Sequence, residues 1–131
     1  MAVNEESLVA SALAARDRAY APYSNYLVGA ALLCVDGTVF TGCNVENASY
    51  GLTCCAERTA VFKAVSEGHQ QFLAIAVATE TGASCCGACR QVLSEFSTDG
   101  ALPVLLAAAD GEFTRTTIGE LLPGAFDGSI L

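Results

Sequence analysis

Hydrophobic and polar positions change their period several times along the chain, and these changes predict alternating helices and strands. Leu8, Val9, Ala12 and Leu13 recur at helical spacing, and Pro22 ends the run. Shorter, nearly continuous apolar runs indicate buried strands. The expected helices cover residues 5–20, 55–67, 87–96 and 118–122. The expected strands cover residues 28–35, 38–43, 73–79, 103–109 and 112–117.

Two Asp-Gly pairs mark tight turns between neighbouring strands, at Asp36-Gly37 and Asp110-Gly111. The other strands alternate with helices, which predicts an α/β layered domain with a mixed sheet of about five strands. The chain has 131 residues, of which 53% are hydrophobic, and this suffices for one domain with a buried core. We therefore expect residues 1–131 to form a single domain.

The charge balance changes the range of expected partners. The chain has 14 acidic and 6 basic residues, a formal net charge of -8, so most of its surface should repel the phosphates of a long nucleic acid. Met1–Ser7 lacks the basic region of a signal peptide, and no apolar run is long enough to span a membrane. We expect a soluble, cytoplasmic protein that binds a small molecule and keeps its seven cysteines reduced.

Three of the cysteines form two motifs with the spacing of metal ligands. Cys55 is followed after one residue by Glu57, and Cys86 and Cys89 form a C-x-x-C pair. Both motifs fall at predicted helix N-termini, where free N–H groups and the helix dipole favour thiolates. Three thiolates leave the fourth coordination position of a zinc ion open to water. Glu57 is the expected proton shuttle beside that position.

Other polar residues near these motifs have two possible roles each. Arg58 and Arg90 follow the cysteine motifs and either donate hydrogen bonds to the thiolates or lie in solvent. Asn44 and Glu46 belong to the polar segment 44–53, whose side chains either make turns or contact a ligand. The pattern of residues alone leaves these alternatives open.

Four motifs together carry a resemblance to a known family. They are NVENASY (44–50), CAERTA (55–60), CGACRQ (86–91) and LLPGAF (121–126). In this order they resemble the small, homotetrameric class of cytidine deaminase, and the resemblance extends from Tyr20 to Phe126. It implies a three-layer α/β/α cytidine deaminase-like fold and one Zn²⁺ per chain. The implied reaction converts cytidine and deoxycytidine to uridine and deoxyuridine with release of ammonia, in pyrimidine salvage.

The resemblance also implies roles for individual residues. The implied zinc ligands are Cys55, Cys86 and Cys89. Glu57 would take a proton from water, deliver it to ring N3 and help protonate the departing amino group. Asn44 and Glu46 would hold the ribose 3'-hydroxyl, and Arg58 would neutralise a thiolate. Phe126 would reach the cytosine ring bound by a neighbouring subunit, so that oligomerisation completes the site.

Three positions depart from the family pattern. Tyr26 stands near the substrate where the family usually has phenylalanine, and Cys85 replaces the proline that usually precedes the C-x-x-C pair. Cys54 adds a second thiol beside Cys55. We expect Cys54 and Cys85 not to bind the metal, although a fourth thiolate would turn the site into a structural zinc module without catalysis. A second alternative is a deaminase of N4-modified cytidines or of a blasticidin S type nucleoside.

The remaining cysteines and the single histidine carry no chemical signal. Cys34 and Cys43 lie on predicted strands, and free cysteine is most often buried as part of a core. His69 follows Gly68 at a predicted helix end and is expected at the surface, away from the metal.

Overall fold

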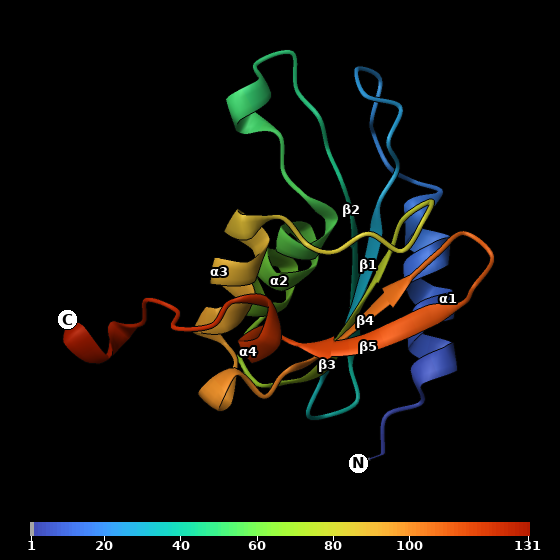
Figure 1. Cartoon of the computed structure of the whole chain (residues 1–131). Coiled ribbons are helices and arrows are strands. Elements are labelled where there is room, and N and C mark those ends of the chain that lie inside the picture. The colour runs from blue at the N-terminus through green and yellow to red at the C-terminus, as the bar shows by residue number, and fades with distance from the viewer. Residues whose placement is uncertain (1) are drawn as a thin grey trace.

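The computed structural model describes residues 2–131 and folds them around one mixed five-stranded sheet (Figure 1). The strands are β1 (Gly29–Cys34), β2 (Val39–Cys43), β3 (Phe72–Ala78), β4 (Pro103–Ala107) and β5 (Phe113–Thr117). Their order across the sheet is β2-β1-β3-β4-β5. The β3–β4 pair is parallel and the other three neighbouring pairs are antiparallel, which confirms the expected mixed sheet.

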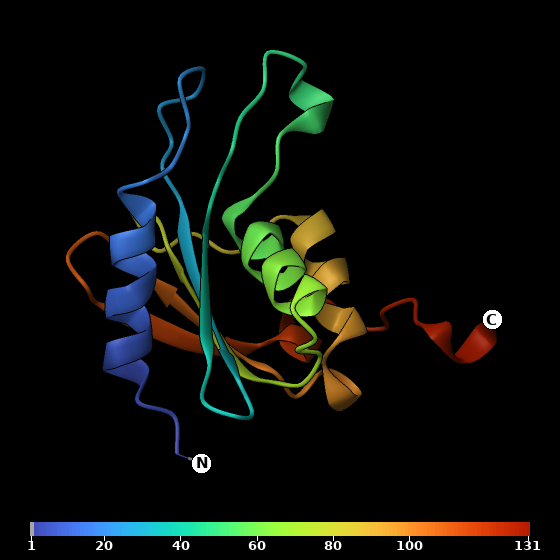
Figure 2. The same cartoon turned by 180° about the vertical axis from the view of Figure 1, so that it is seen from behind.

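Helices cover both faces of this sheet, so the domain has three layers (Figures 1 and 2). Helix α1 (Glu5–Arg16) packs on one face, and α2 (Ala56–Ser66) and α3 (Gly87–Glu95) pack on the other. Neighbouring strand residues point to opposite faces: Leu32 joins the core under α2 and α3, whereas Leu33 joins the core under α1. A sheet buried on both faces explains the continuous apolar runs of the inner strands.

The first helix is shorter than its sequence pattern predicts. It ends at Arg16, and the chain from there to Tyr20 forms turns. The Tyr20 N–H donates to the Asn44 carbonyl at 2.9 Å, and the Tyr20 carbonyl accepts from the Glu46 N–H at 2.8 Å. This pairing with a distant segment replaces the last helical turn, because extended backbone here satisfies the backbone polar groups of both segments.

A close approach between strand and helix fixes the start of α2. A Cβ atom at Gly42 of β2 would lie 2.6 Å from the Ala56 carbonyl oxygen and 2.6 Å from the Ala60 amide nitrogen. Only glycine permits this contact, since real Cβ atoms do not come so close to backbone. Gly42 therefore brings the N-terminus of α2 directly against the sheet.

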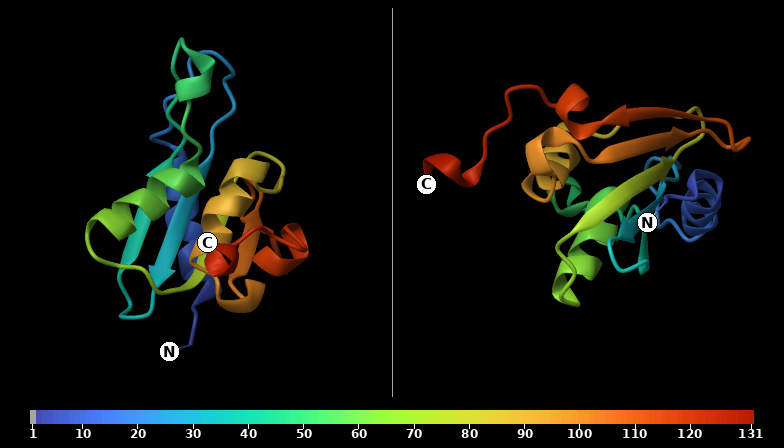
Figure 3. Two further views of the ribbon diagram at one scale, coloured as in Figure 1. Left: turned by 90° about the vertical axis from the view of Figure 1, so that its left-hand side faces the viewer. Right: turned by 90° about the horizontal axis from the view of Figure 1, so that it is seen from below.

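The last part of the chain leaves the body of the domain. After the short helix α4 (Ile118–Leu121), the chain extends away from the sheet and ends in a 3-10 turn at Gly128–Ile130 (Figure 3). None of the helices described for residues 2–131 has the length and apolar character needed to cross a membrane.

Candidate active site

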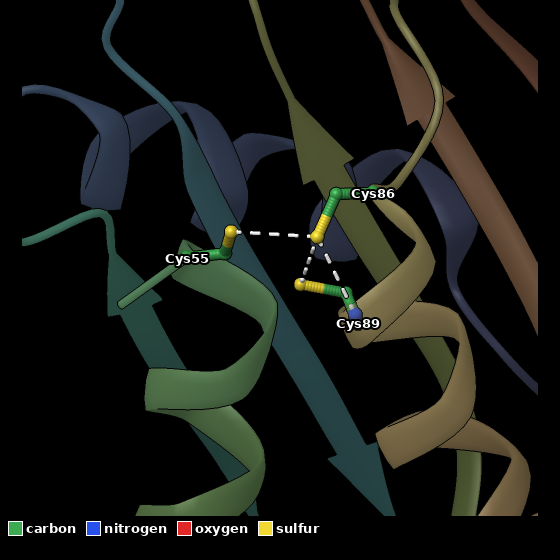
Figure 4. A group of neighbouring side chains, drawn as sticks. All are labelled: Cys55, Cys86 and Cys89. Carbon is green, nitrogen blue, oxygen red and sulfur yellow. Dashed lines mark hydrogen bonds between the residues drawn. The ribbon is translucent and has the colours of Figure 1, made fainter. Parts of the chain in front are cut away.

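The three cysteines predicted to bind metal lie together at the N-termini of two neighbouring helices (Figure 4). Cys55 is the N-cap of α2 and Cys86 is the N-cap of α3, while Cys89 lies in the first turn of α3. The sulfur atoms of Cys55 and Cys86 are 3.7 Å apart, and those of Cys86 and Cys89 are 3.4 Å apart. Segments separated by about thirty residues thus form one cluster whose sulfurs face one another.

The geometry of this cluster fits a zinc ion. Zinc–sulfur bonds of ~2.3 Å in a tetrahedral site place sulfurs ~3.8 Å apart, close to the separations observed here. All three sulfurs lie within 4.8 Å of one another. Among the described residues, neither Cys54 nor Cys85 belongs to this group of three sulfurs. Three protein ligands would therefore leave the fourth coordination position of the ion open.

The charge of the cluster is concentrated on Cys55. Hydrogen bonds from Cys89 first, and then from Arg58 and Cys86, lower the pKa of Cys55 to about 5 even though burial opposes ionisation. The Arg58 Nη2 donates to the Cys55 sulfur at 3.3 Å, as expected for a neutralising arginine. The pKa of Cys89 is raised by its hydrogen bond to Cys55 and by burial, so Cys55 is the first thiol of this pair to ionise.

Glu57 lies in the first turn of α2 and is buried, with 4% of its surface exposed. Burial raises the pKa of its carboxyl group, and the charge of Cys55 adds to this effect. Hydrogen bonds from its own backbone N–H and from the Cys85 thiol oppose the shift. A buried carboxyl group with a raised pKa beside a metal cluster is suited to accept a proton and return it.

A cavity of about 270 Å³ opens over the cluster. This is just below the ~300–1,000 Å³ of typical small-molecule pockets. The predicted site residues that line it are Tyr26, Asn44, Glu46, Cys55, Glu57 and Cys86. They come from the starts of α2 and α3 and from two loops, one before β1 and one directly after β2. The fold therefore brings the predicted metal ligands and the predicted substrate residues to one place.

Asn44 and Glu46 hold the loop that forms the opposite wall of the cavity. The Asn44 side chain, 7% exposed, donates from Nδ2 to the Tyr26 carbonyl at 2.8 Å and accepts from the Val28 N–H at 2.9 Å. The Glu46 carboxylate accepts hydrogen bonds from the N–H of Tyr23 at 2.9 Å, from the N–H of Ser24 at 3.2 Å and from the Ser24 hydroxyl. These long-range contacts were not foreseen from the sequence pattern, which offered only local turns or ligand binding.

Two of the predicted residues lie further from the cluster or make other contacts. Phe126 is 58% exposed on the C-terminal extension, where its carbonyl accepts from Gln91 Nε2 at 3.0 Å, and it does not line the cavity. Arg90 donates to the carbonyls of Cys85 and Leu121, both at 2.8 Å. Among the described residues it makes no hydrogen bond to a sulfur. Arg90 instead links the backbone before Cys86 to the backbone at the end of α4.

Cys34, Cys43 and His69 contact the core, the backbone or other side chains and do not belong to the metal cluster. Cys34 is fully buried in β1, as expected, whereas Cys43 is only partly buried and directs its thiol to the Arg18 carbonyl at 3.5 Å. His69 lies away from the cluster and pairs with Asp36 at 3.0 Å. It is half-buried, because its ring also packs against Phe40.

Comparison with known proteins agrees with this geometry. Residues 2–103 match the family model for the cytidine and deoxycytidylate deaminase zinc-binding region. The cytidine deaminase of Sporosarcina psychrophila is 54% identical over 92% of this chain and 90% of its own length. That of Halalkalibacterium halodurans is 51% identical over 95% of both chains. The crystal structure of cytidine deaminase from Burkholderia pseudomallei superimposes with a TM-score of 0.90, at 52% identity, over 95% of this chain and 100% of that one.

A glutamate beside a three-cysteine cluster, carried on two helix N-termini over a mixed sheet, is the arrangement of the zinc deaminase class. The sequence and structure matches identify one family within this class, because they extend over nearly the whole chain rather than over the metal motifs alone. The chain belongs to the cytidine deaminase family.

Proposed function

We propose that this protein catalyses the zinc-dependent hydrolysis of cytidine and deoxycytidine to uridine and deoxyuridine, with release of ammonia. The observation that carries the proposal is the buried Glu57 carboxyl group in the same cavity as the cysteine cluster. A purely structural zinc site has no use for a buried acid beside it. Zinc held by three thiolates supplies an open position at which a water molecule becomes a nucleophile.

In this proposal Glu57 carries the protons of the reaction. Its carboxylate takes a proton from the attacking water and delivers it to ring N3, which makes C4 of the base more electrophilic. After the water oxygen has bonded to C4, Glu57 takes the remaining proton of this new hydroxyl group and delivers it to the amino group. The C4–N4 bond then breaks, which releases ammonia and leaves the 4-oxo group of the product. Burial keeps bulk water away from this carboxyl group, so the proton returns to the substrate rather than to solvent.

Arg58 and the loop residues support these steps. Hydrogen bonding from Arg58 to Cys55 offsets part of the charge of three thiolates, which would otherwise make the nucleophilic water less acidic. Asn44 and Glu46 are the proposed partners of the ribose 3'-hydroxyl, and Tyr26 borders the same cavity. The Asn44 side-chain amide donates one N–H to the Tyr26 carbonyl, so its second N–H is available to a ligand.

We further propose that the protein is a homotetramer in which Phe126 closes the cavity of a neighbouring subunit. Its ring is exposed, and the segment after α4 to which it belongs extends away from its own domain (Figure 3), which supports a contact with another chain. Tyr50 and Leu52 are 75% and 71% exposed on the 3-10 turn near the cavity, and such apolar groups gather at protein interfaces. Free thiols throughout the chain fit the reducing cytoplasm, where pyrimidine salvage would take place.

The deciding experiment follows the ultraviolet change on mixing the zinc-loaded protein with cytidine, beside Glu57→Gln at equal zinc content. We expect the wild type to form uridine and the variant to bind zinc while losing activity by roughly a thousandfold or more. A wild type that holds zinc but leaves cytidine and deoxycytidine unchanged would refute the proposal. N4-modified cytidines would then be tested as substrates.

The shared site is tested by mixing two inactive variants. Phe126→Ala carries an intact Glu57, and Glu57→Gln carries an intact Phe126, so subunit exchange should create some complete sites. Activity above that of either variant is the expected result, with the mass of the mixture measured by light scattering. A protein that has the mass of one chain and shows no recovery would exclude a site completed by a neighbour.

A further inference from the structure

The Ser24 hydroxyl lies between two groups that it connects. It donates to Glu46 Oε2 and accepts from the Tyr26 N–H at 3.0 Å. A serine hydroxyl has a single proton, and its acceptor side is engaged by the Tyr26 N–H. The proton of Ser24 is therefore directed at the carboxylate.

The Ser24 hydroxyl occupies one of the few acceptor positions of the Glu46 carboxylate. A carboxylate offers about four lone-pair positions, two on each oxygen. Oε1 accepts from the N–H groups of Tyr23 and Ser24, at 2.9 and 3.2 Å, and is thereby fully used. Oε2 accepts from the Ser24 hydroxyl, which leaves one position. Because Glu46 lines the cavity, that position is the one it can offer to a ligand hydroxyl.

The local backbone makes this arrangement possible. Asn25 has a φ of 58°, in the left-handed region that asparagine tolerates better than most residues. The N–H of Asn25 donates to the Ala21 carbonyl at 2.9 Å, so the chain turns back and brings the Tyr26 N–H to Ser24. Ser24 thus belongs to a hydrogen-bonded turn, and its hydroxyl contacts Glu46.

We propose that Ser24 is a positioning residue that holds Glu46 with a single open acceptor aimed at the ribose 3'-hydroxyl, and so selects nucleosides that carry that hydroxyl. The inference rests on the proposed function, in which Glu46 binds the ribose. It predicts that Ser24 contributes to substrate binding and not to the chemical step. A residue with a merely structural role would affect substrates with and without the 3'-hydroxyl alike.

The test compares wild type, Ser24→Ala and Ser24→Thr, all zinc-loaded, on cytidine and on 3'-deoxycytidine. For cytidine we expect Ser24→Ala to raise KM roughly tenfold with kcat changed less than about twofold, since a hydrogen bond to a charged group is lost. For 3'-deoxycytidine the KM values of wild type and Ser24→Ala should agree. Ser24→Thr keeps the hydroxyl and should restore binding of cytidine. Ser66→Ala, an exposed serine at the end of α2, is the control.

Each outcome separates this inference from the proposed function. A wild type inactive on cytidine would overturn the proposed function first. Equal KM values of wild type and Ser24→Ala on cytidine, or equal increases on both nucleosides, would overturn the role of Ser24 alone. A second measurement needs no variant: carbon NMR of the wild-type holoenzyme should give Glu46 a pKa below its ordinary 4.5, and an ordinary value would refute the contact.

Discussion

The two walls of the cavity are built in opposite ways. On one wall, Cys55 and Cys86 occupy the N-cap positions of helices that pack on the sheet, so regular backbone and core packing place their sulfurs. On the other wall, residues 21–28 and 44–53 contain no α-helix or β-strand and are joined by the side chains of Asn44, Glu46 and Ser24. In the proposed function, the reacting groups therefore lie on rigid elements, and the substrate contacts lie on loops that are held by hydrogen bonds.

The largest expected effect comes from breaking the helical wall. Cys89→Ala should abolish stable zinc binding and lower kcat/KM by roughly a thousandfold or more, because two thiolates leave the metal without its third ligand. Metal content by plasma mass spectrometry and the cytidine assay measure this. Cys34→Ala is the matched control, because Cys34 is also fully buried but lies in β1. It should cost only about 1 kcal/mol of stability and keep the metal.

Breaking the loop wall should leave the metal in place. Asn44→Ala removes the partners of the Val28 N–H and the Tyr26 carbonyl, so the free energy of unfolding should fall by about 1–3 kcal/mol and KM should rise. Denaturant unfolding, zinc content and cytidine kinetics test this. Asn47→Ala, at an exposed local turn, should change each quantity little. Loss of zinc from Asn44→Ala would show that the two walls are not independent.

Acid should weaken the loop wall through Glu46. The Ser24 hydroxyl, with the backbone N–H groups of Tyr23 and Ser24, holds the pKa of Glu46 below its ordinary value of 4.5. A lowered native pKa stabilises the fold above the unfolded pKa, and this contribution is lost as pH falls through the native pKa. The difference in melting temperature between wild type and Glu46→Gln should therefore be constant from pH 7 to about 5 and shrink below 4.5. A difference that grows in acid would contradict this assignment.

The smallest effects are expected at the two thiols beside the ligands. Cys54 accepts from the Thr59 hydroxyl at 3.6 Å, and Cys85 is buried against Glu57, so neither belongs to the metal cluster. Cys54→Ala and Cys85→Ala should each retain about one zinc per chain and lose about 1 kcal/mol of stability or less. In peroxide, the double variant should release zinc more slowly than wild type, because fewer thiols beside the ligands can be oxidised. Loss of zinc from either single variant in reducing buffer would identify a fourth ligand.

Much of the fold and of the metal cluster was predictable because it depends on local patterns. Apolar runs and Asp-Gly turns identified the strands, and the C-x-E and C-x-x-C spacings correctly anticipated cysteines at helix starts. The end of α1 was predicted too late, because helical spacing continues while Tyr20 pairs with the backbone of Asn44 and Glu46. Arg90 braces two carbonyls instead of a sulfur, and its position next to Cys89 gave no indication of this.

The sequence by itself determined the order of the elements, the residues able to bind zinc and the glutamate that accompanies them. These depend on residue type and on spacing within one helix, and both can be read along a chain. Only the tertiary structure decided that Ser24 and Glu46 meet, that Asn44 spans two loops, and that Phe126 lies outside its own cavity. These arrangements depend on where distant loops come together, because packing of the sheet and helices sets the distance between residues that share no local pattern.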